Sequence, residues 1–293
     1  MAPSAQYACA QHMYAGRADD YDSSWHRGYT ARFMQLAAPQ PGERVLLLAC
    51  GTGLEAEHAA PLVAGGGNGN DNDDGHGHGL VVGVDATDAM LAVFRRKRDA
   101  DPVLAAHTRV VQHDVTDLSG CAADDEVKPG SFDLIVCSNA FVLFDDPAAV
   151  VRHWKTYLKD GGRMVIDVTH ERNLHQGLLM EAVAERMGVA FPSNRRWITS
   201  RDSFRHVLEG EGLRVDTVEA LEKVSGKGTV YLGADETDAQ FDYLTAMPLG
   251  DALATDEFKH KARPLFKEEW QKASVDGRLE VCDILYVYVA RKV

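Results

Sequence analysis

The sequence has no apolar run long enough to cross a membrane. Its longest apolar runs, such as Val45 to Cys50, are far shorter than the roughly 18–20 residues that a membrane-spanning helix needs. Its N-terminal residues also lack the positive region followed by an apolar stretch that marks a secretory signal. We therefore expect no membrane span and a cytoplasmic location.

Cysteine and positive charge are scarce as well. The five cysteines are scattered and show no C-x-x-C spacing, which argues against a disulfide framework and a structural zinc site. Lysine and arginine number 31 against 44 acids, a net charge of −13, so the chain repels phosphate backbones and anionic lipid at long range. The basic run Arg95–Arg98 is typical of the last turn of a solvated helix. We expect a small-molecule partner and no nucleic acid; the sequence indicates no oligomeric state.

Residues 64–79 are too polar and too rich in glycine to bury a core. They read AGGGNGNDNDDGHGHG, a composition typical of a flexible surface insert. The acids and histidines raise the alternative of a metal site formed by Asp71, Asp73, Asp74, His76 and His78. No expected helix or strand holds them at ligand spacing, so we predict no metal site.

Short apolar runs alternate with helical segments between residues 43 and 170. The expected strands are residues 45–48, 80–84, 109–113, 132–137 and 163–168. Helices are expected over residues 54–63, over 88–98, and from Pro147, after the N-cap Asp146, as far as Gly161-Gly162. Continuous apolar runs are typical of parallel strands buried on both faces. The alternation therefore predicts an α/β fold of right-handed βαβ units.

The pattern changes after His170. The expected elements are helices over residues 172–187 and 201–211, a strand over 213–221, a mostly helical stretch over 235–272 that Pro264 interrupts, and a strand over 281–290. Residues 1–40 are predicted to be helical in pieces. No internal repeat is present, so we interpret the chain as one domain.

A glycine turn lies directly between the first strand and its helix. Gly51-Thr52-Gly53, with Ala56, fits the pattern G-x-G-x-x-A. Glycines at this point let the backbone turn tightly and approach a ligand, and the helix N-terminus offers free N–H groups. Taken alone, the pair of glycines is equally consistent with a tight turn.

Acids follow the second and third strands. Asp85 lies 36 residues after Ala49, and removing the sixteen-residue insert leaves 20, the spacing expected for an acid that accepts ribose hydroxyls. Asp114 ends the third strand, where it could accept an amino proton from adenine. Each aspartate could instead cap a turn. Two acids at successive strand ends, beside a glycine turn, favour a nucleoside-containing ligand.

Five segments in order carry a resemblance to a known family: VLLLACGTG, VVGVDATDAML, VQHDVTDL, SFDLIVCSNAFVLFDDP and YLKDGGRMVIDV. Together they resemble the class I S-adenosylmethionine-dependent methyltransferases, in particular the small-molecule group that includes the ubiquinone/menaquinone-type enzymes. The resemblance covers about residues 43–170. It implies a Rossmann-like, mostly parallel sheet of seven strands in the order 3-2-1-4-5-7-6, with an antiparallel last strand, helices on both faces and a helical lid.

The resemblance also implies one methyltransferase domain over residues 1–293. Residues 1–42 would form an N-terminal helical lid segment, residues 43–170 the cofactor-binding core, and residues 171–293 the acceptor-side helices with the last two strands. S-adenosyl-L-methionine would be the cofactor and S-adenosyl-L-homocysteine the product.

The same resemblance assigns roles to individual residues. The turn formed by Ala49, Gly51, Thr52 and Gly53 would cradle the methionine part, and Asp85 would hold the ribose hydroxyls. The other expected contacts are Ala86 and Met90 against the adenosine, Asp114 and Val115 at the adenine edge, Ser138, Asn139 and Phe141 near the sulfonium, and Tyr21 over the cofactor.

Two positions depart from the family's pattern. The family usually has an acid where Leu47 stands and a glycine where Ala49 stands. That acid helps to hold the methionine amino group, so its loss leaves open a methyltransferase-fold protein that binds the cofactor without methyl transfer. An NAD(P)-dependent oxidoreductase is a further alternative, although no Tyr-x-x-x-Lys pair follows the fourth strand.

Methyl transfer is an in-line attack on an activated methyl group, so the protein mainly aligns the acceptor and excludes water. A base is needed only where the acceptor loses a proton. His170, directly after the fifth strand, is the first candidate base, and His26 is the second. Arg195 or Arg196 could bind an acidic acceptor. We expect transfer to a small organic molecule, with oxygen favoured over nitrogen or carbon because a histidine is available.

Overall fold

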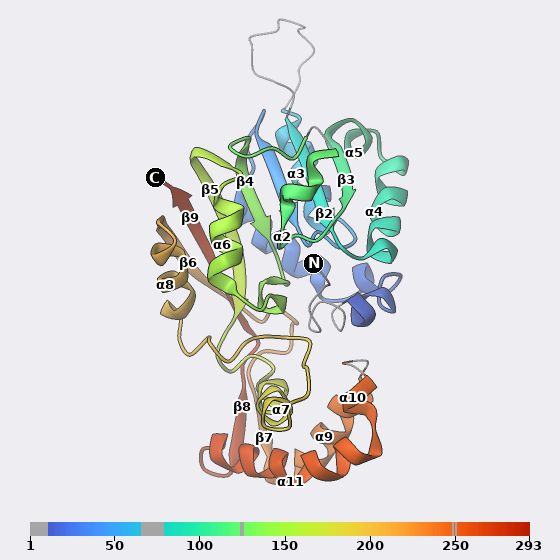
Figure 1. The fold of residues 1–293 in the computed structure, drawn as a ribbon, viewed down its shortest axis with the longest axis vertical. Coiled ribbons are helices and arrows are strands. Elements are labelled where there is room, and N and C mark those ends of the chain that lie inside the picture. Colours follow the sequence, from blue (N-terminus) through green and yellow to red (C-terminus); the bar gives the residue numbers. More distant parts are fainter. Residues whose placement is uncertain (1–10, 66–78, 124–125, 248, 250) are drawn as a thin grey trace, which may run out of the picture.

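The apolar runs of the sequence form a central seven-stranded sheet in the computed structural model, which describes residues 11–65, 79–123, 126–247, 249 and 251–293. The strand order is β3-β2-β1-β4-β5-β9-β6 (Figure 1). The strands are β1 (Arg44–Leu48), β2 (Leu80–Asp85), β3 (Thr108–Gln112), β4 (Phe132–Cys137), β5 (Leu158–Thr169), β6 (Leu213–Glu222) and β9 (Ile284–Lys292). The first five are parallel, and β9 runs antiparallel to both β5 and β6. The predicted fold class and strand order are confirmed.

Helices cover both faces of this sheet, as predicted. One face is covered by α2 (His26–Ala37), α3 (Leu54–Val63), α4 (Asp88–Ala100) and α5 (Pro102–His107), which bury their apolar sides against the strands. The other face is covered by α6 (Pro147–Lys155) and α8 (Asp202–Gly210). Asp146 caps α6 through a bond from the Ala149 N–H, as its position before Pro147 predicts.

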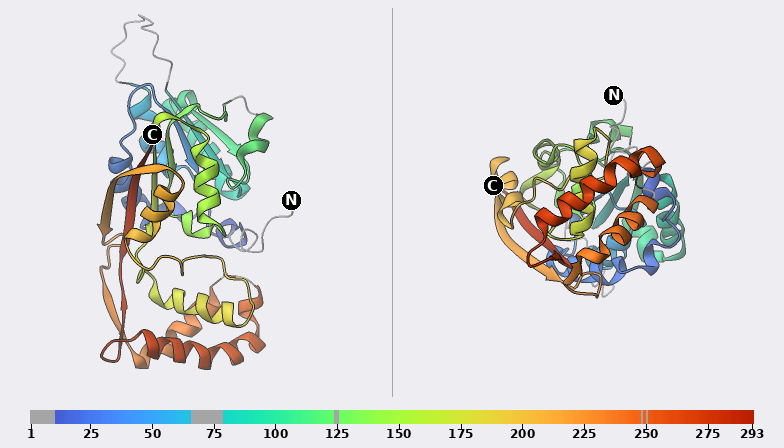
Figure 2. Two further views of the ribbon diagram at one scale, coloured as in Figure 1. Left: turned by 60° about the vertical axis from the view of Figure 1, so that its left-hand side comes forward. Right: turned by 90° about the horizontal axis from the view of Figure 1, so that it is seen from below.

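A second layer, the helical layer, lies beyond the carboxyl ends of the parallel strands (Figures 1 and 2). It consists of α7 (His175–Arg186), β7 (Val230–Gly233), η4 (Ala234–Glu236), α9 (Thr237–Ala246), α10 (Asp251–Ala254), α11 (Asp256–Ala273) and β8 (Arg278–Val281). It has its own apolar core, which includes Phe241, Phe266 and Trp270. α7 packs between the sheet and α11, which lies outermost. The division of the chain into three functional segments stays a prediction.

Three boundaries predicted from the sequence were wrong. The helix α6 ends at Lys155 instead of Gly161, because the chain turns through Tyr157 and enters β5 at Leu158. The predicted last strand is two strands, since β8 pairs with β7 in a separate small sheet. Pro264 lies within α11 and does not interrupt it; the buried side of the helix packs on both sides of the proline.

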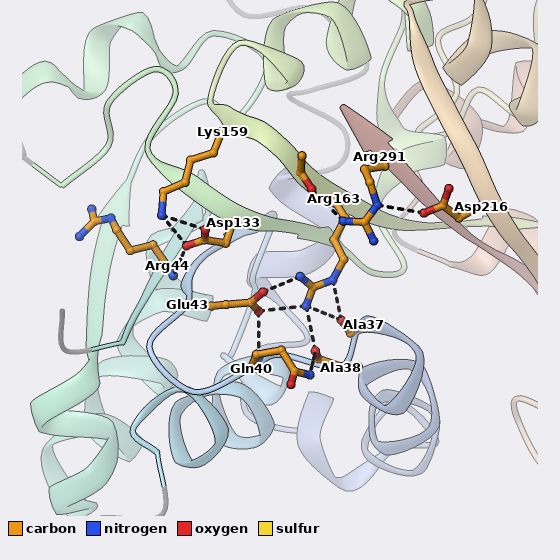
Figure 3. Close-up of polar contacts among 11 residues, drawn as sticks. Ala37, Ala38, Gln40, Glu43, Arg44, Asp133, Lys159, Arg163, Asp216 and Arg291 are labelled. Atoms are coloured by element: carbon orange, nitrogen blue, oxygen red, sulfur yellow. Dashed lines mark hydrogen bonds and ion pairs between the residues drawn. The ribbon is translucent and has the colours of Figure 1, made fainter. Parts of the chain in front are cut away.

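An ion-pair network joins the end of α2, the start of β1 and β5 at the amino ends of the strands. Figure 3 shows Arg163 of β5 at its centre. Its Nη1 lies 2.6 Å from Oε1 of Glu43, and its Nη2 donates to the carbonyls of Ala37 and Ala38 at 3.0 and 2.8 Å. The network therefore fixes the end of α2 against β1 and β5.

Candidate functional site

A cavity of about 770 Å³ lies at the carboxyl ends of the parallel strands. Open α/β sheets bind ligands at this edge, and pockets of this volume hold small molecules and cofactors. The residues expected at the cofactor that line it are Tyr21, Ala49, Gly51, Asp85, Ala86, Met90, Asp114, Val115, Ser138 and Asn139. The fold thus brings together most of the predicted binding residues, which come from four strand ends and the N-terminal segment (residues 11–25).

The turn after β1 has an unusual backbone. Ala49, Gly51 and Gly53 all have positive φ, at 54°, 51° and 78°. Gly51 lines the cavity, and a Cβ there would meet nothing within 4 Å, so its open side is free for a ligand. Gly53 serves packing instead, because a Cβ there would stand 2.5 Å from the ring of Phe94. Ala49 adopts a left-handed conformation that glycine would adopt at lower cost.

Asp85 links the end of β2 to this turn. Its Oδ2 accepts the Gly51 N–H at 2.8 Å, and its Oδ1 accepts the Thr87 N–H at 2.7 Å. Burial raises the pKa of Asp85, and the two backbone donors oppose that shift. A carboxylate held in this way keeps lone pairs for hydroxyl donors in the cavity.

The adenine end of the predicted site follows β3. Asp114 and Val115 line the cavity together with Met90 from α4. Oδ1 of Asp114 accepts the N–H and the hydroxyl of Thr116, at 2.9 and 2.7 Å. Asp114 is therefore a turn residue that also lines the cavity, and its contact with adenine stays a prediction.

The loop after β4 differs in part from the expectation. Ser138 and Asn139 line the cavity, and Asn139 has a positive φ of 54°. Phe141 is fully buried instead, with its ring centroid 4.5 Å from that of Phe204, and is not among the lining residues. The short helix η3 (Phe141–Leu143) turns this ring into the core, and Leu143 of the same segment lines the cavity.

The remaining members of the turn lie just outside the lining. Thr52 is buried, and its hydroxyl donates to the carboxylate of Asp22. Gly53 begins α3 and packs on Phe94. Both residues therefore shape the turn and do not face the cavity.

The N-terminal segment covers the cavity with residues that the sequence did not reveal. Tyr21 was expected there, but Gln11 and Tyr14 line the cavity too. The Nε2 of Gln11 donates to the Ala86 carbonyl at 3.0 Å, and the rings of Tyr14 and Tyr21 lie edge to face at 6.4 Å. Burial raises the pKa of both phenols, which keeps them neutral. No local pattern distinguishes Gln11 or Tyr14 from any other residue of an amphipathic segment.

Neither candidate base lines the cavity. His26 is stacked between Tyr21 and Trp25, with centroid distances of 4.1 and 4.0 Å, and burial lowers its pKa to about 4. Nδ1 of His170 accepts the Arg172 N–H at 3.0 Å. A neutral His170 in this arrangement carries its proton on Nε2 and has no free lone pair for another.

Two carboxyl groups that the sequence analysis missed lie behind Ser138: the partly exposed Glu55, in the first turn of α3, and the buried Asp167, in β5. The Ser138 hydroxyl has one proton and can donate it to either carboxylate. Burial raises the pKa of Glu55 to about 7 and that of Asp167 to about 6. Raised acid pKa values beside a cavity are typical of functional sites.

The two arginines considered for an acidic acceptor are engaged elsewhere. Arg195 is buried, and its guanidinium donates to the Asn173 carbonyl at 2.9 Å and lies 3.8 Å from Glu181. Arg196 pairs with Glu185 at the surface. The basic run Arg95–Arg98 is likewise paired, each member with an acid of the chain.

The family described as "Methyltransferase domain" matches residues 21–218, which include the whole cavity wall from Tyr21 to Val150. The chain belongs to this family. It is assigned to the class I S-adenosylmethionine-dependent methyltransferases, as the resemblance predicted. The membership decides against the oxidoreductase alternative.

Known relatives agree with this membership. The chain is 31% identical over 124 residues to a ubiquinone biosynthesis O-methyltransferase of Albidiferax ferrireducens, covering 42% of this chain and 40% of that protein. It is 30% identical over 153 residues to the protein of the same name from Ralstonia nicotianae, covering 52% and 54%. The chain thus spans about half the length, or less, of these curated relatives. A solved Bacillus halodurans structure assigned as a methyltransferase has a TM-score of 0.55 at 20% identity, covering 90% of this chain and 98% of that one.

S-adenosylmethionine is the cofactor of this methyltransferase, and the site fits it. The open side of Gly51 leaves room for the chain of the methionine part, and Asp85 and Asp114 offer oxygens to the ribose and adenine. When bound, the cofactor supplies a methyl group that its positive sulfur has already activated. Within the described ranges no helix is long and apolar enough to span a membrane, and no group of three or more metal-binding side chains is present. The candidate ligands of the insert, Asp71 to His78, lie outside these ranges.

Proposed function

We propose that this methyltransferase transfers the methyl group to an oxygen of a small, uncharged, quinol-like or phenolic acceptor. The observation that carries the proposal is the cover over the cavity. Tyr14 and Tyr21 are partly buried lining residues that close one side of it. A large acceptor would have to displace them, whereas a small one fits within about 770 Å³ beside the cofactor.

The charges at the cavity favour a neutral acceptor. Among the residues that the structure describes, its lining includes five aspartates, namely Asp85, Asp114, Asp117, Asp145 and Asp146, and no lysine or arginine. Such a wall repels carboxylates and phosphates. The names of the curated relatives support oxygen as the accepting atom, and a quinol hydroxyl is a neutral group of this kind.

Alignment of the acceptor is the main contribution of the chain to the reaction. The Asn139 backbone N–H is fixed on both oxygens of Asp167 at 3.0 Å, so the loop after β4 presents a rigid wall to the cavity. A rigid wall holds the two reacting atoms in line and keeps water out. His170 would serve as a base only after its ring had left the Arg172 N–H, and His26 only after Tyr21 had moved.

Product analysis tests this proposal. The purified chain is incubated with S-adenosylmethionine and matched acceptors: a catechol, the corresponding aromatic amine, a carbon nucleophile and a benzoate. We expect S-adenosylhomocysteine and a methyl ether from the catechol alone. Transfer only to the amine or the carbon nucleophile, or a preference for the benzoate, would overturn the assignment of a neutral oxygen acceptor.

A further inference from the structure

Position 47 supplies no charge to the cofactor. Leu47 is 1% exposed and packs in the apolar core under α2 and α3. In the family the acid at this position helps to hold the amino group of the methionine part. That amino group is an ammonium ion at neutral pH, and a buried cation without an anionic partner is strongly disfavoured. The chain therefore needs a different acid at this end of the site.

Glu55 has the position and the unmet charge for this role. It stands two residues after Gly53, in the first turn of α3, beside the turn that receives the methionine part. Its carboxyl group has the Ser138 hydroxyl, its own backbone N–H and, at 3.3 Å, the hydroxyl of Thr30 as hydrogen-bond partners. Glu55 itself is not among the lining residues, so it reaches the cavity beside Ser138. Ser138 in turn lines the cavity. Within the described part of the chain, no lysine or arginine forms an ion pair with Glu55.

Asp167, the buried acid behind Ser138, is held by shorter bonds. Its Oδ2 accepts the Tyr29 hydroxyl at 2.5 Å, and both of its oxygens accept the Asn139 N–H. These bonds occupy three of the four lone pairs of the carboxylate. Asp167 therefore fixes the loop after β4. Glu55, which the Thr30 hydroxyl reaches only at 3.3 Å, is the less firmly held of the two acids.

We propose that Glu55 binds the ammonium group of the methionine part of the cofactor, in place of the acid missing at Leu47. The ammonium would donate to the carboxylate beside Ser138, and the Ser138 hydroxyl would keep that carboxylate in place. Charge-assisted bonds of this kind are among the stronger ones in proteins. The inference rests on the cofactor of the family and is independent of the acceptor proposed above.

Two ligands isolate this contact. S-adenosylhomocysteine and methylthioadenosine share the adenosine and a neutral sulfur, but only the former carries the amino acid part. For Glu55→Gln, titration calorimetry is expected to show about 10- to 100-fold weaker binding of S-adenosylhomocysteine and unchanged binding of methylthioadenosine. Glu219→Gln, an exposed acid on β6, serves as the matched control and is expected to change neither affinity.

The outcomes separate this inference from the cofactor assignment. If Glu55→Gln binds S-adenosylhomocysteine as tightly as the unchanged protein, or loses both ligands equally, the role of Glu55 is wrong while the cofactor site stands. If the unchanged protein binds neither ligand, the cofactor site itself is wrong, and the role of Glu55 with it.

If Glu55→Gln fails to fold, a measurement on the unchanged protein still tests the proposal. The ammonium stabilises the charged form of Glu55, so S-adenosylhomocysteine binding at pH 7 should release protons, and methylthioadenosine binding should not. Calorimetry in two buffers of different ionisation enthalpy measures this release. The titratable groups that surround Glu55 are Asp167 of β5, Tyr29 of α2, Tyr21 of η1 (Tyr21–Ser23), Cys50 of the turn and Cys137 of β4, and Asp85 lies on the far side of Cys50. Equal proton release with both ligands would overturn the proposal, because methylthioadenosine reaches Asp85 but lacks the ammonium.

Discussion

The hydroxyl of Thr52 donates a hydrogen bond to the carboxylate of Asp22, which joins the glycine turn to the N-terminal segment that covers the cavity. The same carboxylate lies 2.7 Å from Nζ of Lys97 in α4. Tyr21 directly precedes Asp22 and lines the cavity. The cover is therefore fastened to the turn that we propose for the methionine end of the cofactor.

Loosening this contact should speed the release of cofactor. We expect Asp22→Asn to raise the dissociation rate of S-adenosylhomocysteine about 5- to 30-fold, because the charge-assisted bond from Thr52 and the ion pairs with Lys97 and Arg27 are weakened. Stopped-flow displacement measures that rate. The adjacent Asp20 is exposed and provides the matched control, Asp20→Asn, which should leave the rate unchanged. Equal rates for the two variants would show that Asp22 does not hold the cover.

Asp85 should be needed by every ligand that contains the ribose. For Asp85→Ala we expect at least about 100-fold weaker binding of both S-adenosylhomocysteine and methylthioadenosine, because the ribose loses its acceptor and the Gly51 N–H loses its partner. Calorimetry compares the two affinities. Unchanged binding by Asp85→Ala would contradict the placement of the ribose at the end of β2. The exposed Asp88 in the first turn of α4 offers the control Asp88→Asn.

Local sequence signals located the residues that belong to strand ends. Gly51, Asp85, Asp114 and Ser138 follow apolar runs directly, so the βαβ pattern alone brings them to one edge of the sheet. His170 also follows its strand, but the edge is wide, and its ring lies against Tyr286 of β9 instead of in the cavity. A strand end therefore predicts the edge but not the place along it.

Other members of the site depend on packing that no short motif encodes. Gln11 and Tyr14 reach the cavity because the N-terminal segment folds back over Ala86. In the sequence Asp167 is a single acid within a strand. Only its bonds to Tyr29 and Asn139 in the folded chain show that it holds the loop after β4. The same limit explains Phe141, since a one-turn helix decides whether a ring faces the core or the cavity.

The raised pKa of Glu55 predicts a loss of stability as the pH rises. Its pKa is about 7 in the folded chain against 4.5 for the free group, so the folded state binds more protons between these values and stability falls as the pH rises through this window. We expect Glu55→Gln to match the unchanged protein near pH 5 and to be more stable by about 1–3 kcal/mol at pH 8. Urea unfolding across pH 5–8 measures the free energy of unfolding. A constant difference at all pH values would contradict the shifted pKa.

Arg163 should affect stability without affecting the site. It lies at the amino ends of the strands, opposite the cavity, and bonds to Glu43, Ala37 and Ala38 (Figure 3). We expect Arg163→Met to lower the free energy of unfolding by about 2–4 kcal/mol, because Glu43 and two carbonyls lose a partner that is largely buried. Urea unfolding measures the loss. The affinity for S-adenosylhomocysteine at a temperature where the variant is folded should stay unchanged, and a weaker affinity would mean that the two ends of the sheet are coupled.

Conservative replacement of His170 or His26 should leave the rate of methyl transfer nearly unchanged. A general base contributes about 100- to 10,000-fold to a rate, yet Nδ1 of His170 is occupied by the Arg172 N–H, and His26 is a stacking partner of Tyr21 with a pKa near 4. With a catechol acceptor we expect His170→Gln to turn over within about threefold of the unchanged protein's rate, well short of the loss of a base. His26→Phe keeps a ring between Tyr21 and Trp25 and should behave alike, while His26→Ala leaves Tyr21 unsupported and should raise KM. If instead either conservative variant turned over about 100-fold more slowly or worse, with the low-pH limb of the pH profile abolished, that histidine would be established as the base.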